Sequence, residues 1–207
     1  MNQHRTTPEP SKWARIIQAD PEHTNRYIQR FKVMEEQGHD LYGEARFVDA
    51  MVGRNAHILD AGCGPGRLDG WLHERGHRVV GVDLDPGLIA AAEIDHPGPT
   101  YFVGDLAELD LPARGVEDPF DVIVCAGNVM GFLAESTRSE VLRRLANHLA
   151  DDGRLAIGFG AGRGYEFDEF IGDATAAGLQ LELALSTWDL RPYRDGDGFL
   201  VAVFARA

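Results

Sequence analysis

Cysteine is scarce in this chain. Of its 207 residues only Cys63 and Cys125 are cysteines, and they lie far apart in the sequence. Neither belongs to a spacing that zinc sites use, and two such residues cannot form a disulfide framework of the kind found in small secreted domains. We therefore expect no metal, and we interpret both cysteines as small buried residues.

Long apolar runs are missing as well. No uncharged apolar segment reaches the length of a transmembrane helix. The first residues, MNQHRTTPEPSKW, lack the apolar core of a signal peptide. These two absences predict a cytoplasmic protein with no membrane partner.

Basic residues are few relative to acidic ones. The chain has 20 Lys and Arg against 33 Asp and Glu, which gives a formal net charge of -13. A field of that sign repels phosphate polymers, so an extended nucleic-acid-binding surface is not expected. The charge favours a small or neutral partner.

What the sequence does contain, after Asn55, is an alternation of short apolar runs with amphipathic stretches. The pattern predicts strands at 56–60, 78–82, 100–103, 120–125 and 153–159, and helices from about 66 and at 86–95, 137–149 and 166–177. Runs such as VVGVD are nearly continuous in apolar residues, which is typical of parallel strands covered on both faces. This pattern indicates a doubly wound α/β fold. Thr137 and Glu140 are expected to form a capping box for the 137–149 helix.

Both ends of the chain depart from this alternation. At the C-terminus, LQLELALS, RPYRDGDG and FLVAVFA predict a strand, a turn and a last strand that runs antiparallel. At the N-terminus the pattern is polar and helical, with Asp20 and Pro21 resembling an N-cap and a first helical position, and a further helix expected at 41–51. We therefore divide the chain into a helical cap, residues 1–54, and a core, residues 55–207.

The stretch ILDAGCGPGRL, residues 58–68, places three glycines directly behind an acid. Asp60 ends the first strand, and Gly62, Gly64 and Gly66 occupy the turn before the next helix. Glycine lets a ligand approach the main chain, and a helix N-terminus presents free N–H groups. The G-x-G-x-x-G spacing of a dinucleotide site is not present. A tight turn without a ligand is the alternative interpretation.

The order D-x-G-C-G-x-G resembles the cofactor loop of the class I methyltransferases that use S-adenosylmethionine. Three later motifs extend the resemblance: VVGVDLDP with Asp83, YFVGDLAEL with Asp105, and FDVIVCAGNVMGFL with Asn128. The resemblance covers about residues 55 to 207. It implies a Rossmann-like seven-stranded sheet in the order 3-2-1-4-5-7-6 with the last strand antiparallel, whereas the first 50 residues match only the variable helical cap of many members.

The resemblance also implies roles for the motif residues. The loop would wrap the amino-acid end of the cofactor, Asp83 would accept hydrogen bonds from both ribose hydroxyls, and Asp105 would accept one from the adenine amino group. Leu84 and Leu106 would cover the adenine. Asp85, before Pro86, is expected to cap the next helix, which leaves Asp83 free. The predicted cofactor-binding residues are Asp60, Ala61, Gly62, Cys63, Gly64, Gly66, Asp83, Leu84, Asp105, Leu106 and Asn128.

Methyl transfer needs alignment of donor and acceptor, and a base only if the acceptor arrives protonated. Asn128 is not followed by the Pro-Pro-Tyr of the methyltransferases that act on DNA or protein amides, so a small-molecule acceptor is predicted. No catalytic residue is identified, and His23 is either a base or a helix-surface residue. Candidate contacts to the acceptor, or for Arg46 to the cofactor's carboxylate, are Tyr27, Arg46, Arg163, Tyr165, Arg191 and Tyr193.

Two other functions remain open at this point. A non-catalytic protein that binds S-adenosylmethionine would keep every cofactor residue. An NAD(P)-dependent oxidoreductase would share the acid at Asp83, which NAD-binding folds use for the same ribose contact. The glycine spacing and the final hairpin count against the oxidoreductase.

Overall fold

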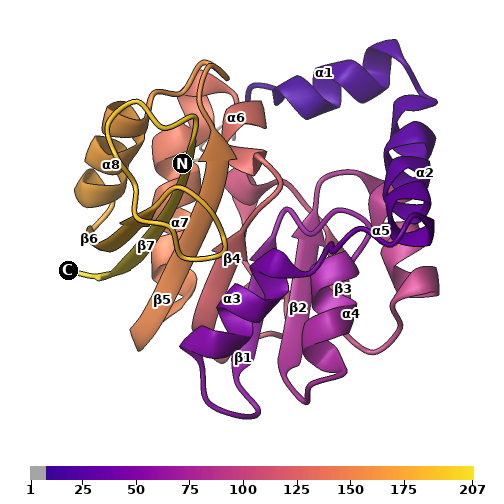
Figure 1. Cartoon of the computed structure of the whole chain (residues 1–207), viewed down its shortest axis with the longest axis horizontal. Coiled ribbons are helices and arrows are strands. Elements are labelled where there is room, and N and C mark those ends of the chain that lie inside the picture. The colour runs from indigo at the N-terminus through magenta and orange to yellow at the C-terminus, as the bar shows by residue number, and fades with distance from the viewer. Residues whose placement is uncertain (1–7) are drawn as a thin grey trace, which may run out of the picture.

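The computed structural model describes residues 8–207. A single seven-stranded sheet runs through it with helices on both faces (Figure 1). The order β3-β2-β1-β4-β5-β7-β6 confirms the predicted strand order. Strands β1 to β5 pair in parallel, and β7 is antiparallel to β5 and β6. The strands are β1 His57–Ala61, β2 Arg78–Asp83, β3 Thr100–Val103, β4 Phe120–Cys125, β5 Leu149–Gly160, β6 Leu179–Leu185 and β7 Phe199–Arg206.

The helices alternate with the strands as the hydrophobic pattern predicts. The α-helices are α1 Lys12–Ala19, α2 His23–Glu36, α3 Gly43–Met51, α4 Arg67–His73, α5 Pro86–Asp95, α6 Val129–Phe132, α7 Arg138–His148 and α8 Phe167–Ala176. Short 3-10 turns lie at η1 Leu106–Glu108, η2 Pro112–Arg114 and η3 Glu135–Thr137.

The sheet has a hydrophobic cluster on each face, because neighbouring side chains of a strand point in opposite directions. In β1, Ile58 packs with residues of α3 and α4, and Leu59 packs with residues of α7 on the other face. Both leucine and isoleucine are fully buried. This burial on both faces explains why the central strands are rich in apolar residues.

Two of the predicted helix caps are wrong. The Thr137 hydroxyl donates to the carbonyl of Ala134, and Glu140 pairs with two arginines of its own helix, so no capping box forms at α7. Asp20 ends α1 instead of starting α2, which begins at His23. At both positions the side chain has a hydrogen-bond partner that the local sequence pattern does not predict.

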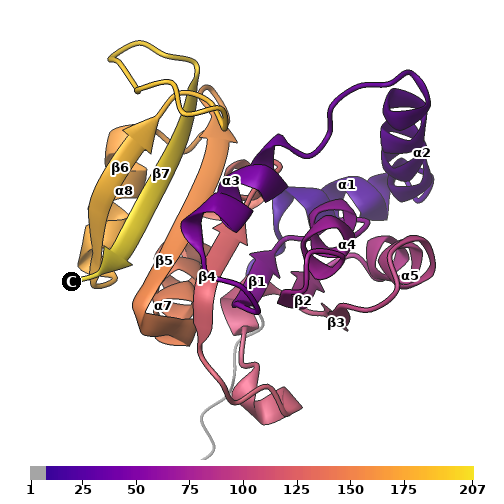
Figure 2. The same ribbon diagram turned by 60° about the horizontal axis from the view of Figure 1, so that its bottom comes forward.

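The N-terminal helices differ in how they attach to the sheet. Helix α3 packs into the core, where Ala45 and Val48 are fully buried. Helices α1 and α2 lie to one side, near α4 and α5 (Figure 2). Trp13 is the buried residue of α1 and Thr24 that of α2, within helices that the structure describes completely. The first seven residues of the predicted cap lie outside the described residues.

Candidate cofactor site

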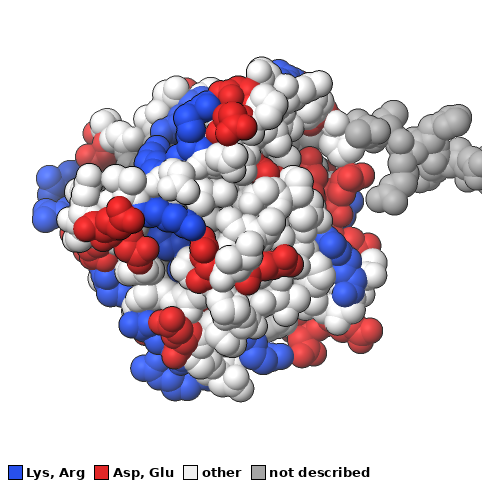
Figure 3. Space-filling model, turned by 90° about the vertical axis from the view of Figure 1, so that its right-hand side faces the viewer, with Lys and Arg blue, Asp and Glu red and all other residues white. Residues whose placement is uncertain are grey.

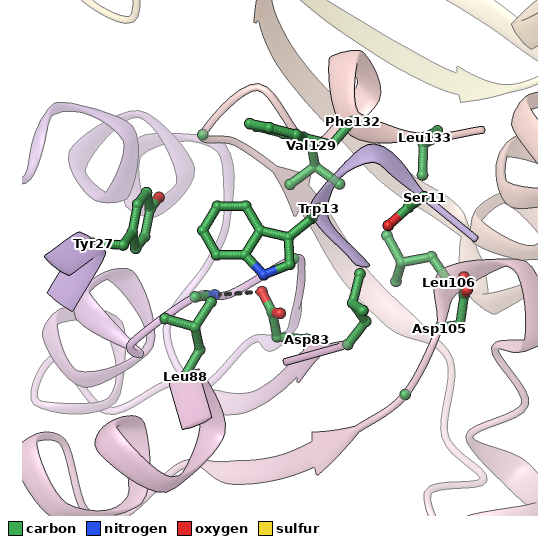
Figure 4. Close-up of a pocket in the computed structure, with 15 residues that line it drawn as sticks. Ser11, Trp13, Tyr27, Asp83, Leu88, Asp105, Leu106, Val129, Phe132 and Leu133 are labelled. Carbon is green, nitrogen blue, oxygen red and sulfur yellow. Dashed lines mark hydrogen bonds between the residues drawn. The ribbon is translucent and has the colours of Figure 1, made fainter. Parts of the chain in front are cut away.

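A pocket opens where β1 and β4 lie side by side, at their carboxyl ends (Figure 4). The order of the strands reverses at this point, and open α/β sheets bind ligands at such positions. The pocket encloses about 650 Å³ with its open mouth included, which is the size of a small-molecule site. Its lining residues are Ser11, Trp13, Tyr27, Gly62, Gly64, Asp83, Leu84, Leu88, Gly104, Asp105, Leu106, Gly127, Val129, Phe132 and Leu133.

The glycines of the loop after β1 serve different purposes. A Cβ at Gly62 would lie 2.3 Å from a methyl group of Val129, and one at Gly66 would lie 2.7 Å from the Cβ of Ala92, so close packing requires both. Both also have positive φ angles. At Gly64 the nearest atom to an added Cβ is in the Tyr27 ring, 3.9 Å away. Gly64 therefore leaves its backbone open towards the pocket.

Asp83 ends β2 and presents its carboxylate to the pocket. Its Oδ2 accepts a hydrogen bond from the backbone N–H of Gly64 at 2.9 Å, and its Oδ1 accepts one from that of Asp85, also at 2.9 Å. Burial raises the pKa of Asp83 to about 6, against the effect of these two hydrogen bonds. Each oxygen keeps a lone pair for a ligand hydroxyl.

Asp105 lies on the other side of the pocket, after β3. Its Oδ1 accepts a hydrogen bond from the N–H of Ala107 at 2.8 Å and caps η1. Leu106, buried, lies next to it and faces the pocket together with Leu84 and Leu88. The result is a polar edge with an apolar floor, which suits a heteroaromatic ring that carries an amino group.

The upper wall of the pocket is aromatic. The Trp13 ring lies edge-on to Tyr27, with centroids 5.1 Å apart, and to Phe132, with centroids 5.6 Å apart. Burial raises the pKa of Tyr27, and the nearby Asp83 raises it further. Tyr27 was predicted from the sequence as a site residue, whereas Trp13 and Phe132 were not. The one sequence feature that points to Trp13 is that it is an isolated tryptophan in a polar segment.

A pair of buried acids lies behind the glycine loop. Asp60 is 2% exposed and Asp69, in α4, is fully buried. Burial is the main cause that raises the pKa of each, and Asp60 adds to the rise at Asp69. The two carboxyl oxygens of Asp69 have no hydrogen-bond partner among residues 8–207. In the sequence, the one sign that Asp69 could be buried is that it directly follows the apolar Leu68. In the structure both residues are buried in α4.

The structure brings six of the predicted cofactor residues to the pocket wall: Gly62, Gly64, Asp83, Leu84, Asp105 and Leu106. The other five stand behind it or beside it: Asp60, Ala61, Cys63, Gly66 and Asn128. Asn128 has a left-handed backbone, and its Oδ1 accepts a hydrogen bond from the N–H of Gly160 at 2.8 Å. It therefore ties the end of β4 to the end of β5.

Of the predicted acceptor contacts only Tyr27 lines the pocket. Tyr165 does not line the pocket, because this side chain is fully buried in the core and its hydroxyl donates to Asp173 at 2.7 Å. Its apolar ring stacks on Phe159, with centroids 6.0 Å apart. A tyrosine after a glycine-rich loop is as compatible with the core as with a ligand.

The remaining four candidates lie away from the pocket wall. Arg46 forms an exposed ion pair with Asp40, and Arg191 pairs with Asp189 at 3.6 Å. Arg163 lies against Gly131, and Tyr193 packs edge-on against Phe167. These four residues were predicted to contact the acceptor or the cofactor, but in the structure none of them lines the pocket.

The described residues hold neither a metal-type cluster nor a membrane-spanning helix. Within residues 8–207 there is no group of three or more His, Cys, Asp or Glu side chains that could hold a metal ion. No helix in that part of the chain combines the length and the apolar character needed to cross a membrane.

Comparison with known proteins identifies the same core. A family model described as "Methyltransferase domain" matches residues 58–153. Among solved structures, a TehB-like SAM-dependent methyltransferase from Corynebacterium glutamicum is 49% identical, with a TM-score of 0.86, covering 91% of this chain and 100% of that one. A methyltransferase from Clostridium acetobutylicum, 12% identical with a TM-score of 0.74 over 88% of this chain and 98% of its own, shares the fold.

Curated relatives match over shorter stretches. The trans-aconitate 2-methyltransferase of Methylobacterium nodulans is 34% identical over 104 residues, 49% of this chain and 37% of its own length. An N,N-dimethyltransferase of a dTDP-amino sugar from Streptomyces fradiae is 28% identical over 130 residues, 60% of this chain and 49% of its own. The chain thus spans about half or less of these two relatives. The glycine loop, the strand order and the full-length match together establish that the chain belongs to the class I family of S-adenosylmethionine-dependent methyltransferases.

Proposed function

We propose that this protein transfers the methyl group of S-adenosylmethionine to a small-molecule acceptor. The observation that carries the proposal is the pocket in which Asp83 and the open backbone at Gly64 lie together with an aromatic wall containing Trp13. Asp83 suits a ribose, and the backbone at Gly64 suits a polar amino-acid end. Aromatic faces attract cations, and the cofactor's sulfonium is one.

The chain's own residues have limited tasks in such a reaction. The bound cofactor supplies an activated methyl group on a positively charged sulfur. Asp83 would fix the ribose, while Leu84 and Leu106 would hold the adenine by apolar contact. Trp13 and Phe132 exclude water from the space above, which leaves alignment of the two reactants as the main contribution of the protein.

The lining residues also restrict the acceptor. None of the fifteen, all within the described part of the chain, is a lysine, arginine or histidine. The raised pKa of Tyr27 keeps its phenol protonated, and Asp83 and Asp105 already accept backbone hydrogen bonds. An acceptor with an available lone pair, a nitrogen or sulfur atom, therefore fits better than a hydroxyl group that needs a base.

Calorimetric titration with S-adenosylmethionine and S-adenosylhomocysteine tests the proposal. We expect micromolar binding by the wild type, loss of binding in Asp83→Ala, and unchanged binding in Glu108→Ala, an exposed acid of η1 that does not line the pocket. Absence of binding by folded wild-type protein would overturn the proposal.

A second step separates an enzyme from a binding protein. Transfer of labelled methyl groups is measured on panels of small amines, thiols and alcohols. Turnover on amines or thiols supports the proposal. Binding without turnover on any panel would favour the non-catalytic S-adenosylmethionine-binding protein instead.

A further inference from the structure

Asp85 connects the N-terminal helices to the cofactor pocket without lining it. The residue is 3% exposed, and its Oδ1 accepts a hydrogen bond from the N–H of Gly87 at 2.8 Å, which caps α5. Its Oδ2 accepts two more, from the indole Nε1 of Trp13 at 3.1 Å and from the hydroxyl of Thr24. One carboxylate thus holds α1, α2 and α5 together.

The same residue contacts the cofactor-binding acid on its other side. The backbone N–H of Asp85 donates to Asp83, and Asp83 accepts from the N–H of Gly64 with its second oxygen. An unbroken series of hydrogen bonds therefore runs from Trp13 and Thr24 through Asp85 to the glycine loop. Figure 4 shows the Trp13 indole and Asp83 among the residues that line the pocket.

The two donors are also the buried side chains of α1 and α2. Trp13 and Thr24 are each 8% exposed, and they are the buried residues of α1 and α2. The ion pair between Lys32 of α2 and Asp95 of α5 is, by contrast, largely solvent-exposed, and exposed pairs contribute little. The Asp85 carboxylate is therefore a buried contact that both helices share, in addition to the hydrogen bonds of Lys12 to the carbonyls of Gly131 and Arg163 and the packing of Trp13 on Phe132.

We propose that Asp85 is a positioning residue that holds Trp13 over the cofactor pocket, so that closure of α1 and α2 and binding of the cofactor form one coupled equilibrium. This inference rests on the proposed function. A ligand that fills the pocket contacts Trp13 on the cap as well as Asp83 and Gly64 on the core. It must then stabilise the closed arrangement, and any change that opens the cap must weaken binding.

The test uses Asp85→Asn and Trp13→Phe. Asparagine caps helices about as well as aspartate, but its neutral amide cannot accept from both Trp13 and Thr24 while capping α5. Phenylalanine keeps an aromatic ring and removes only the N–H donor. Lys32→Ala is the matched control, because it breaks a contact between α2 and α5 that does not involve Asp85.

Hydrogen exchange and calorimetry give the two readouts. Without ligand, we expect amides of residues 12–19 to exchange faster by about tenfold in Asp85→Asn and Trp13→Phe than in wild type. S-adenosylhomocysteine should bind both variants about tenfold more weakly, because the closed fraction falls. The double variant should bind S-adenosylhomocysteine no more weakly than the weaker-binding single variant, since both changes break the same contact. Lys32→Ala should behave as wild type.

Opposite results would overturn the inference. Two results would show that Asp85 does not couple closure of α1 and α2 to ligand binding. One is equal affinity for S-adenosylhomocysteine in wild type and Asp85→Asn. The other is that S-adenosylhomocysteine slows the exchange of α1 equally in the two proteins. If Asp85→Asn does not fold, Trp13→Phe carries the same test. Failure of the wild type to bind would overturn the proposed function, and exchange of α1 in the free variants would still decide on the role of Asp85.

Discussion

At the scale of single residues, Asp83 links the chemistry of the pocket to pH. Burial raises its pKa to about 6, and only the ionised form can accept from two ligand hydroxyls while keeping its backbone hydrogen bonds. We expect affinity for S-adenosylhomocysteine to fall as the pH is lowered from about 7.5 to about 5, because ligand binding then competes with proton uptake. Calorimetry across this range measures the effect.

Asp83→Asn is the control for that prediction. An asparagine has the same size but does not titrate, so its weaker binding should change little over the same range. A persistent pH dependence in the variant would assign the titration to another group.

Asp69 offers a second prediction, on stability. Its burial raises its pKa far above the ordinary value, so the folded protein keeps a proton that the unfolded chain has released. The free energy of unfolding therefore falls as the pH rises from about 4 towards the raised pKa. Asp69→Asn, which stays neutral, should therefore lose less stability than the wild type between about pH 5 and about pH 8.

Urea denaturation at the two pH values measures this difference. Asp110→Asn, at an exposed acid, serves as the comparison and should show the pH dependence of the wild type. Identical pH dependence in Asp69→Asn and wild type would contradict the prediction.

At the scale of secondary-structure elements, two aromatic side chains, Trp188 and Tyr193, pack the connection between β6 and β7 against the rest of the fold. Trp188 packs edge-on against Phe47 of α3, with centroids 5.4 Å apart, and a Cβ at Gly158 of β5 would lie 2.3 Å from its ring. Gly158→Ala should therefore lower the free energy of unfolding by about 1–3 kcal/mol through overpacking. Urea denaturation measures this, and affinity for S-adenosylhomocysteine should be retained.

Gly172 supplies the matched glycine. It lies exposed in α8, where an added Cβ meets nothing within 4 Å. Gly172→Ala should raise the free energy of unfolding by about 0.5–1 kcal/mol, because alanine loses less backbone entropy in a helix. Destabilisation by both substitutions would argue against packing at Trp188 as the cause.

Secondary-structure elements were predictable from the sequence where the residues within the element are enough to identify it. Strand β4 was expected at 120–125 and is Phe120–Cys125, because a run apolar on both faces needs no partner to be recognised. The start of α7 was predicted within one residue, but its capping box does not form, because the Thr137 hydroxyl bonds to Ala134 instead of to its own helix. The full role of Asp85 was not predictable, because this predicted helix cap also binds two donors from distant helices.

At the scale of the whole molecule, the pocket draws on segments from both ends of the sequence. The residues found by resemblance, such as Asp83, come from the core, where each motif follows directly on a strand. Ser11, Trp13 and Phe132 were missed, because their contribution arises only when α1 docks. The assignment to the methyltransferase family also removes the support for an NAD(P)-dependent oxidoreductase.

Surface charge leads to a prediction about nucleic acids. The formal net charge is -13, and on the face seen in Figure 3 acidic and basic side chains alternate without a continuous basic stripe. One relative, an 18S rRNA methyltransferase from Mus musculus, is 25% identical over 126 residues. We nevertheless expect no measurable binding of a labelled RNA oligonucleotide at about 0.15 M salt, because phosphate contacts need basic residues.

Fluorescence anisotropy checks this prediction, with a basic RNA-binding protein as the positive control. Binding with a steep salt dependence would point to a basic surface on a face other than the one in Figure 3. It would also reopen the question of a macromolecular acceptor.

The attachment of α1 and α2 through Asp85 has a consequence for synthesis of the chain. The ribosome releases Trp13 and Thr24 before it has made the carboxylate that holds them, and Phe132 follows later still. During translation the two helices therefore have no docking site until β2 and the start of α5 have emerged. A nascent chain that ends before Phe132 lacks part of the aromatic wall, so the complete pocket is available to the cofactor only in a chain that has grown past that residue.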